Sequence, residues 1–197
     1  ELGAAASPAL ARAVAASGLA PWVTLVFRAP APLLDHLPEL QRELAVAAEL
    51  ARGGDGPARY QIAWRPGPEA AVDPAQYAFL LKRASVAITG ARPGAWVVSA
   101  PLPADPEWLR ALYAEEVAAY LGVVTFAPAG EEAMEAAITL LGELDPGRPL
   151  ALDGPPLPDS PATALLEAAR WASRGIRLVL FRAPAAHPAL LAPFRVL

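Results

Sequence analysis

Three arginines, Arg28, Arg65 and Arg182, each stand directly after a short apolar run of the sequence. A guanidinium keeps its positive charge at neutral pH and can bind a carboxylate or a sulfate through two parallel hydrogen bonds. Trp64, beside Arg65, could present a flat ring on which a sugar stacks. Together these side chains would suit an acidic sugar. The alternative is that each arginine has its own structural partner and that Trp64 fills the core.

Asp153 also ends an apolar run, and Gly154-Pro155 follows it. Its carboxylate could serve as the nucleophile of a hydrolase, with Glu69 or Asp73 as the second acid. The alternative is a turn, because aspartate is favoured where a chain turns beside glycine and proline. We therefore assign no catalytic residue, and Asp153 is the candidate that a hydrolase would use.

The sequence predicts neither a metal site nor a cofactor. His36 and His187 lie far apart, no carboxylate pattern accompanies either, and the chain has no cysteine. The chain also has no Gly-rich phosphate-binding loop of the dinucleotide or Walker type. This argues against a third class of function, an α/β enzyme acting on a nucleotide or a phosphorylated substrate.

The composition excludes further classes of function. The formal net charge of -4 argues against a general nucleic-acid-binding protein, which would normally be basic. No run of ~18 apolar residues is long enough to span a membrane. With 197 residues, the chain can bury a sizeable core. We expect residues 1–197 to form a single domain that belongs to a longer protein.

Short β-rich apolar runs alternate with longer helical runs along the chain. The runs are continuous, as in strands that are covered on both faces. The predicted strands are Trp22–Phe27, Tyr60–Trp64, Trp96–Ala100, Val123–Phe126, Pro149–Asp153 and Ile176–Phe181. The predicted helices cover residues 8–16, 39–52, 74–89, 106–120, 131–144 and 161–173. Several of them begin with an N-cap residue followed by proline, namely Ser7-Pro8, Asp73-Pro74, Asp105-Pro106 and Ser160-Pro161.

This alternation predicts an α/β fold built from parallel βα units. Two arrangements of the sheet fit it: an open, doubly wound sheet, and a parallel (β/α) barrel of TIM type. The doubly wound sheet usually carries a Gly-rich loop after its first strand, whereas the strand ends here are rich in proline, which lacks the N–H that binds phosphate. The sequence therefore favours the barrel, in a partial form with about six βα units visible.

Residues 59–101 resemble the fourth and fifth βα units of the clan A glycoside hydrolases, which are (β/α)8 barrels. A strand of that family reads Tyr/Phe-Glu-Ile-Trp-Asn-Glu-Pro, and the next begins Pro-x-Ala-x-Val-Val. The chain has Tyr60-Gln61-Ile62-Ala63-Trp64-Arg65-Pro66 and later Pro93-Gly94-Ala95-Trp96-Val97-Val98. The segment 148–154 is similar to the family's seventh strand, which carries the nucleophile. This alignment implies barrel strands three to eight, with strands one and two absent from the chain.

The catalytic positions depart from the family pattern. Retaining glycosidases use two carboxyl groups about 5–5.5 Å apart, one as acid and one as nucleophile. The acid position is Arg65, the preceding asparagine position is Trp64, and Asp153 falls one residue before the nucleophile position. The resemblance thus implies a degenerate barrel, a pseudoenzyme, rather than an active enzyme.

The expected function is a non-catalytic, glycosidase-like domain for carbohydrate binding or for structural assembly. In a barrel, a ligand-binding rim would lie at the carboxyl ends of the strands. Its members would be Arg28, Trp64, Arg65, Asp153 and Arg182. The expected partners are a polysaccharide or acidic glycan, other domains of the same protein or an assembly partner, and not nucleic acid. The alternative is an active glycoside hydrolase with displaced carboxylates. The resemblance also implies an extracytoplasmic location.

Overall fold

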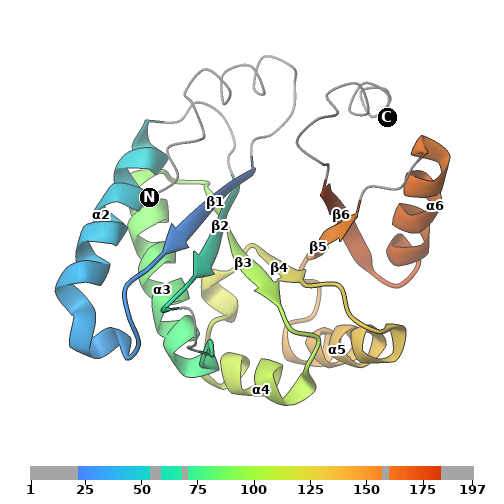
Figure 1. The fold of residues 1–197 in the computed structure, drawn as a ribbon, viewed down its shortest axis with the longest axis horizontal. Coiled ribbons are helices and arrows are strands. Elements are labelled where there is room, and N and C mark those ends of the chain that lie inside the picture. The colour runs from blue at the N-terminus through green and yellow to red at the C-terminus, as the bar shows by residue number, and fades with distance from the viewer. Residues whose placement is uncertain (1–21, 54–58, 68–70, 157–159, 183–197) are drawn as a thin grey trace. The chain divides into compact units, whose positions relative to one another are not determined.

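A computed structural model describes residues 22–53, 59–67, 71–156 and 160–182 of the chain. The described strands form one six-stranded parallel sheet in the order β1-β2-β3-β4-β5-β6, and helices alternate with them (Figure 1). The strands are β1 (Trp22–Phe27), β2 (Arg59–Trp64), β3 (Trp96–Leu102), β4 (Val123–Phe126), β5 (Leu150–Pro156) and β6 (Ile176–Arg182). The helices are η1 (Leu33–His36), α2 (Leu37–Arg52), α3 (Pro74–Ala91), α4 (Pro106–Ala114), η2 (Ala118–Tyr120), α5 (Glu131–Leu144) and α6 (Pro161–Ala172).

The strand order distinguishes the two sheet arrangements that the sequence allows, an open doubly wound sheet and a TIM-type barrel. Consecutive strands are neighbours throughout, as in TIM-type barrels, whereas the order reverses midway in a doubly wound sheet. The parallel α/β prediction is therefore confirmed and the doubly wound alternative is wrong. The described sheet is not closed, because β1 and β6 are its end strands. The predicted helix over residues 8–16 lies outside the described residues.

One predicted helix differs from the structure. The apolar spacing predicts a helix over residues 106–120, but α4 ends at Ala114, and Glu116 has a left-handed backbone with a φ of 57°. The Lys82 ammonium of α3 donates a 2.8 Å hydrogen bond to the carbonyl of Glu115. This tertiary contact satisfies a carbonyl at the end of the helix, and η2 then follows as a separate turn.

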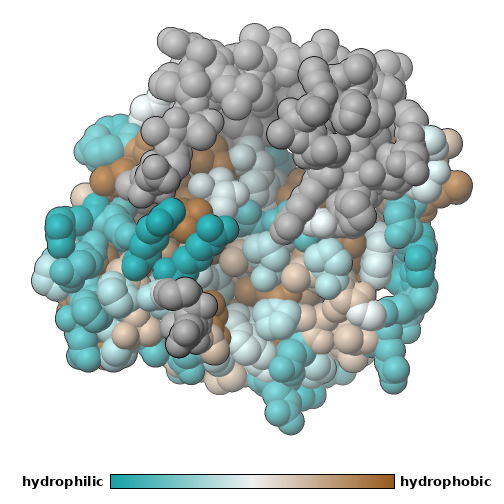
Figure 2. Space-filling model, in the orientation of Figure 1, coloured by the Kyte–Doolittle hydropathy of each residue, from teal (hydrophilic) through white to brown (hydrophobic). Residues whose placement is uncertain are grey.

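The chain divides into two compact units. Unit 1 holds residues 1–100 and 110–123, and unit 2 holds residues 101–109 and 124–197. In the described ranges, no helix is long and apolar enough to cross a bilayer. Hydrophilic residues gather over α2 and along the margin near α6 in the space-filling view (Figure 2).

In unit 1 the two faces of β2 have different surroundings. Successive side chains of a strand point to opposite faces. The hydroxyl of Tyr60 accepts a 3.2 Å hydrogen bond from Arg92 at the end of α3, so the face with Tyr60, Ile62 and Trp64 is the helix-covered one. Gln61 lies on the opposite face.

Tyr77 of α3 ties β2 to β3. Its side chain is buried, and its hydroxyl donates to the carbonyl of Ile62 at 2.8 Å and accepts from the N–H of Ala100 at 2.6 Å. Burial raises the pKa of the Tyr77 phenol well above its usual value. The hydroxyl therefore stays protonated and keeps its donor role at neutral pH.

We expect Tyr77→Phe to lower the free energy of unfolding by about 1–3 kcal/mol, because two buried backbone groups lose their partner. Chemical denaturation checks this value. The control is Tyr120→Phe at a half-buried position of η2, which we expect to cost less than about 0.5 kcal/mol. Equal losses in the two variants would contradict the bridging role of Tyr77.

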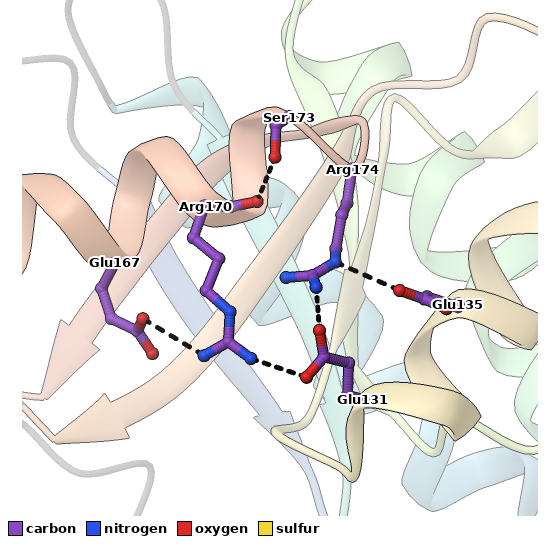
Figure 3. A network of polar contacts seen from close by, with 6 residues as sticks. All are labelled: Glu131, Glu135, Glu167, Arg170, Ser173 and Arg174. Carbon is purple, nitrogen blue, oxygen red and sulfur yellow. Dashed lines mark hydrogen bonds and ion pairs between the residues drawn. The ribbon is translucent and has the colours of Figure 1, made fainter.

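In unit 2, ion pairs join α6 to α5. Figure 3 shows the guanidinium of Arg170 reaching the carboxylate of Glu131 at 2.8 Å. Arg174, just after α6, contacts the same Glu131 carboxylate and lies 3.3 Å from that of Glu135. Both arginines also lie near the Trp171 ring, at 5.8 and 5.6 Å from its centroid. These partly exposed contacts hold the outer helices of unit 2 together.

Candidate functional site

Arg65 stands at the carboxyl end of β2, where the resemblance places the catalytic acid. Its backbone N–H donates a 2.9 Å hydrogen bond to the carbonyl of Phe27, so the pairing of β1 with β2 continues to this residue. Strand alternation then places the Arg65 side chain on the same face as Gln61 and Ala63. The residue is exposed. A fixed positive charge therefore lies at the strand end.

Trp64 lies in the core of unit 1. It is 5% exposed, and its indole N–H donates a 2.8 Å hydrogen bond to the carbonyl of Ala29. A ring in this position leaves little surface for a sugar to stack on. The contact instead ties the end of β2 to the loop that follows β1.

The loop after β1 is also held by a carboxylate of α2. Both oxygens of Glu43 accept from the backbone N–H of Arg28, at 2.9 and 3.0 Å, and one accepts from that of Ala29 at 3.2 Å. Arg28 is exposed. Phe27 pairs with Trp64 in the sheet, so Arg28 and Arg65 directly follow paired residues of neighbouring strands. The structure thus places these two arginines at adjacent strand ends of unit 1.

A polar pair, of which Gln61 is buried and Thr24 is exposed, lies on the Arg65 face of the sheet. Gln61 is 3% exposed, and its side-chain oxygen accepts a 2.9 Å hydrogen bond from the hydroxyl of Thr24. The two residues are paired across β1 and β2. Neither Glu43 nor this pair is predicted from the sequence. The alternation of Gln61 with Tyr60 and Ile62 was the available signal for an inward polar residue.

Asp73, a candidate second acid, has a structural role at the start of α3. Its carboxylate accepts a 2.9 Å hydrogen bond from the N–H of Gln76, which is the contact of a helix N-cap. Gln76 in turn accepts from the N–H of Leu33 at 3.0 Å. Glu69, the other candidate second acid, lies outside the described residues.

The remaining rim candidates belong to unit 2. Asp153 is half-buried in β5, pairs with Leu180 of β6, and precedes Gly154, whose φ of 104° favours glycine. The structure thus places Asp153 within a strand that continues to Pro156, with an irregular register after Asp153, rather than in a turn, and the nucleophile role is untested. Arg182 is the last residue of β6, and its side chain lies outside the described part of the chain.

The two histidines of the chain lie far apart in the sequence. His36 ends η1, whereas His187 lies outside the described residues. In the described part of the chain, no three His, Asp or Glu side chains are grouped closely enough to hold a metal ion.

In unit 1, three side chains bind backbone groups near the strand ends, and one charged side chain is exposed. Glu43, Trp64 and Tyr77 are occupied with backbone groups of the strands and of the loop after β1. Arg65 stays exposed at the end of β2. Comparison with known proteins adds no assignment to this geometry: no family model matches the chain, and no curated protein is significantly similar to it.

Proposed function

We propose that this chain is a non-catalytic, glycosidase-like domain that binds an acidic glycan at the carboxyl ends of its strands. The observation that carries the proposal is the exposed guanidinium of Arg65 at the end of β2, on the Gln61 face. In the clan A glycoside hydrolases, which the sequence resembles, the matching position holds the catalytic acid. That resemblance, the positive charge of Arg65 and its exposure together support a binding role.

The chemistry of the residues at this strand end supports binding rather than hydrolysis. A guanidinium keeps its proton at neutral pH, so it cannot protonate a leaving group. Trp64 already donates its indole N–H to a backbone carbonyl. The Asp73 carboxylate is engaged as an N-cap. These groups therefore lack the free proton donor that glycoside hydrolysis needs.

The charge at the strand ends supports an acidic ligand. Arg28 and Arg65 follow the paired residues Phe27 and Trp64, so both cations belong to adjacent strand ends. A carboxylate or sulfate group of a sugar fits the fork of an arginine donor. Asp153 and Arg182 belong to unit 2, and a binding role for them stays a prediction from the sequence.

The experiment compares binding of a uronic-acid oligosaccharide with binding of its neutral counterpart by calorimetry. We expect binding of the acidic sugar only, and weaker binding as salt rises from about 50 to 300 mM, because exposed charges are screened. Arg65→Gln should lower the affinity by about three- to tenfold. Arg83→Gln, the same change at an exposed position of α3, is the control and should leave the affinity unchanged.

Two outcomes would contradict the proposal. One is equal affinity for the acidic and the neutral oligosaccharide, which would remove the role of charge. The other is unchanged affinity in Arg65→Gln. Absence of any glycan binding would favour the purely structural role of an assembly domain.

A second candidate function is hydrolysis by displaced carboxylates. The observation that favours it is the carboxylate residue Asp153, which is half-buried in the middle of β5. This candidate requires turnover that depends on Asp153.

A further inference from the structure

Glu43 of α2 binds the backbone directly beyond β1, and both elements belong to unit 1. Its two carboxylate oxygens accept from the N–H of Arg28, and one of them also accepts from the N–H of Ala29. A hydrogen bond to an ionised carboxylate is roughly twice as strong as one between neutral groups. Glu43 therefore fixes two consecutive peptide groups at the end of β1.

The direction of these peptide groups explains why a side chain binds them. The carbonyl of Phe27 accepts from the N–H of Arg65, so the peptide groups of Phe27 face β2. Backbone groups of successive strand residues point to opposite sides of the strand. The N–H of Arg28 therefore points away from β2, and β1 is an end strand of the described sheet. Glu43 supplies the acceptor that a neighbouring strand supplies elsewhere in the sheet.

Ala29 is also held from a second direction. Its carbonyl accepts the indole N–H of Trp64, and the residue is 2% exposed. The backbone on which Arg28 stands is thus fixed by a helix on one side and by β2 on the other, whereas Arg28 is itself exposed. A charged group on a fixed backbone loses less conformational freedom when it binds a ligand.

We propose that Glu43 is a positioning residue, which fixes the backbone of Arg28 so that the Arg28 guanidinium can bind the acidic group of a glycan. The inference rests on the proposed function, because it concerns the same strand ends. The sign of the effect separates positioning from charge. Loss of a negative charge beside Arg28 would by itself strengthen the binding of an anion, whereas loss of positioning weakens it.

The first test is Glu43→Gln, which keeps the length of the side chain and removes its charge. We expect the affinity for the uronic-acid oligosaccharide, measured by calorimetry, to fall by about three- to fivefold. The matched control is Glu39→Gln, on the same helix, where the carboxylate pairs with Arg42 at 3.3 Å. The control should leave the affinity unchanged within about twofold.

A double-mutant cycle tests whether Glu43 acts through Arg28. Arg28→Gln alone should lower the affinity by about three- to tenfold. Adding Glu43→Gln to Arg28→Gln should lower it no further, within about twofold, because the two residues act as one unit. A general structural role of Glu43 would instead lower the affinity in both backgrounds.

Amide hydrogen exchange tests the positioning without a glycan. We expect the amides of Arg28 and Ala29 to exchange at least about tenfold faster in Glu43→Gln than in the wild type or in Glu39→Gln. Unchanged exchange, unchanged or higher affinity in Glu43→Gln, or additive losses in the double variant would overturn the inference. The proposed function would still stand if Arg65→Gln lost affinity. Equal affinity of the wild type for the acidic and the neutral oligosaccharide would overturn both.

Discussion

Replacement of Trp64 by alanine is expected to lower the free energy of unfolding by about 3–5 kcal/mol. The substitution removes a large side chain that is 5% exposed and leaves a cavity in the core of unit 1. It also removes the hydrogen bond from the indole to the carbonyl of Ala29. Denaturant titration of the variant and the wild type measures the loss.

Trp96→Ala is the matched control. Trp96 begins β3, is 46% exposed, and has the guanidinium of Arg59 at 5.7 Å from its ring centroid. Because about half of the side chain is already in water, we expect a loss of about 1–2 kcal/mol. A loss in Trp64→Ala no larger than in Trp96→Ala would show that Trp64 is not the core residue described above.

Arg65→Glu is expected to create no glycosidase activity, although it restores the acid of the resembled family. General acid catalysis typically contributes ~10²–10⁴-fold, but only when the acid, the nucleophile and the sugar contacts are positioned together. Trp64 would still fill the preceding position with a buried ring. Release of nitrophenol from aryl β-glycosides measures the activity.

The control for Arg65→Glu is Arg65→Gln, which removes the positive charge without adding a carboxyl group. Both variants should match the wild type in turnover. A rate increase in Arg65→Glu that Arg65→Gln lacks would mean that the remaining site is intact, and the non-catalytic proposal would then fail.

Most of the fold follows from local sequence patterns. The strands are continuous apolar runs, and β1 and β4 have the predicted bounds. Helix starts at Pro74, Pro106 and Pro161 were predictable because an N-cap and a proline act within one turn of the chain. The end of α4 was not, because it coincides with a contact between Lys82 and the carbonyl of Glu115, which are distant in the sequence.

The site was less predictable than the fold. That Arg65 ends a strand could be inferred from the apolar run before it. The contact of the Glu43 carboxylate with the loop after β1 could not be inferred. Apolar periodicity indicates only which face of α2 is buried and does not give the position of the helix along β1. The Thr24–Gln61 hydrogen bond likewise depends on the register of β1 with β2. Polar partners distant in sequence require the tertiary structure.

The most direct test of the central claim is the turnover of wild-type protein on aryl β-glycosides and on neutral and acidic polysaccharides. Asp153→Asn is assayed beside it under the same conditions. The account predicts no hydrolysis above the background rate in either protein, since Arg65 cannot protonate a leaving group. Turnover by the wild type that disappears in Asp153→Asn would contradict the account and establish a hydrolase with displaced carboxylates.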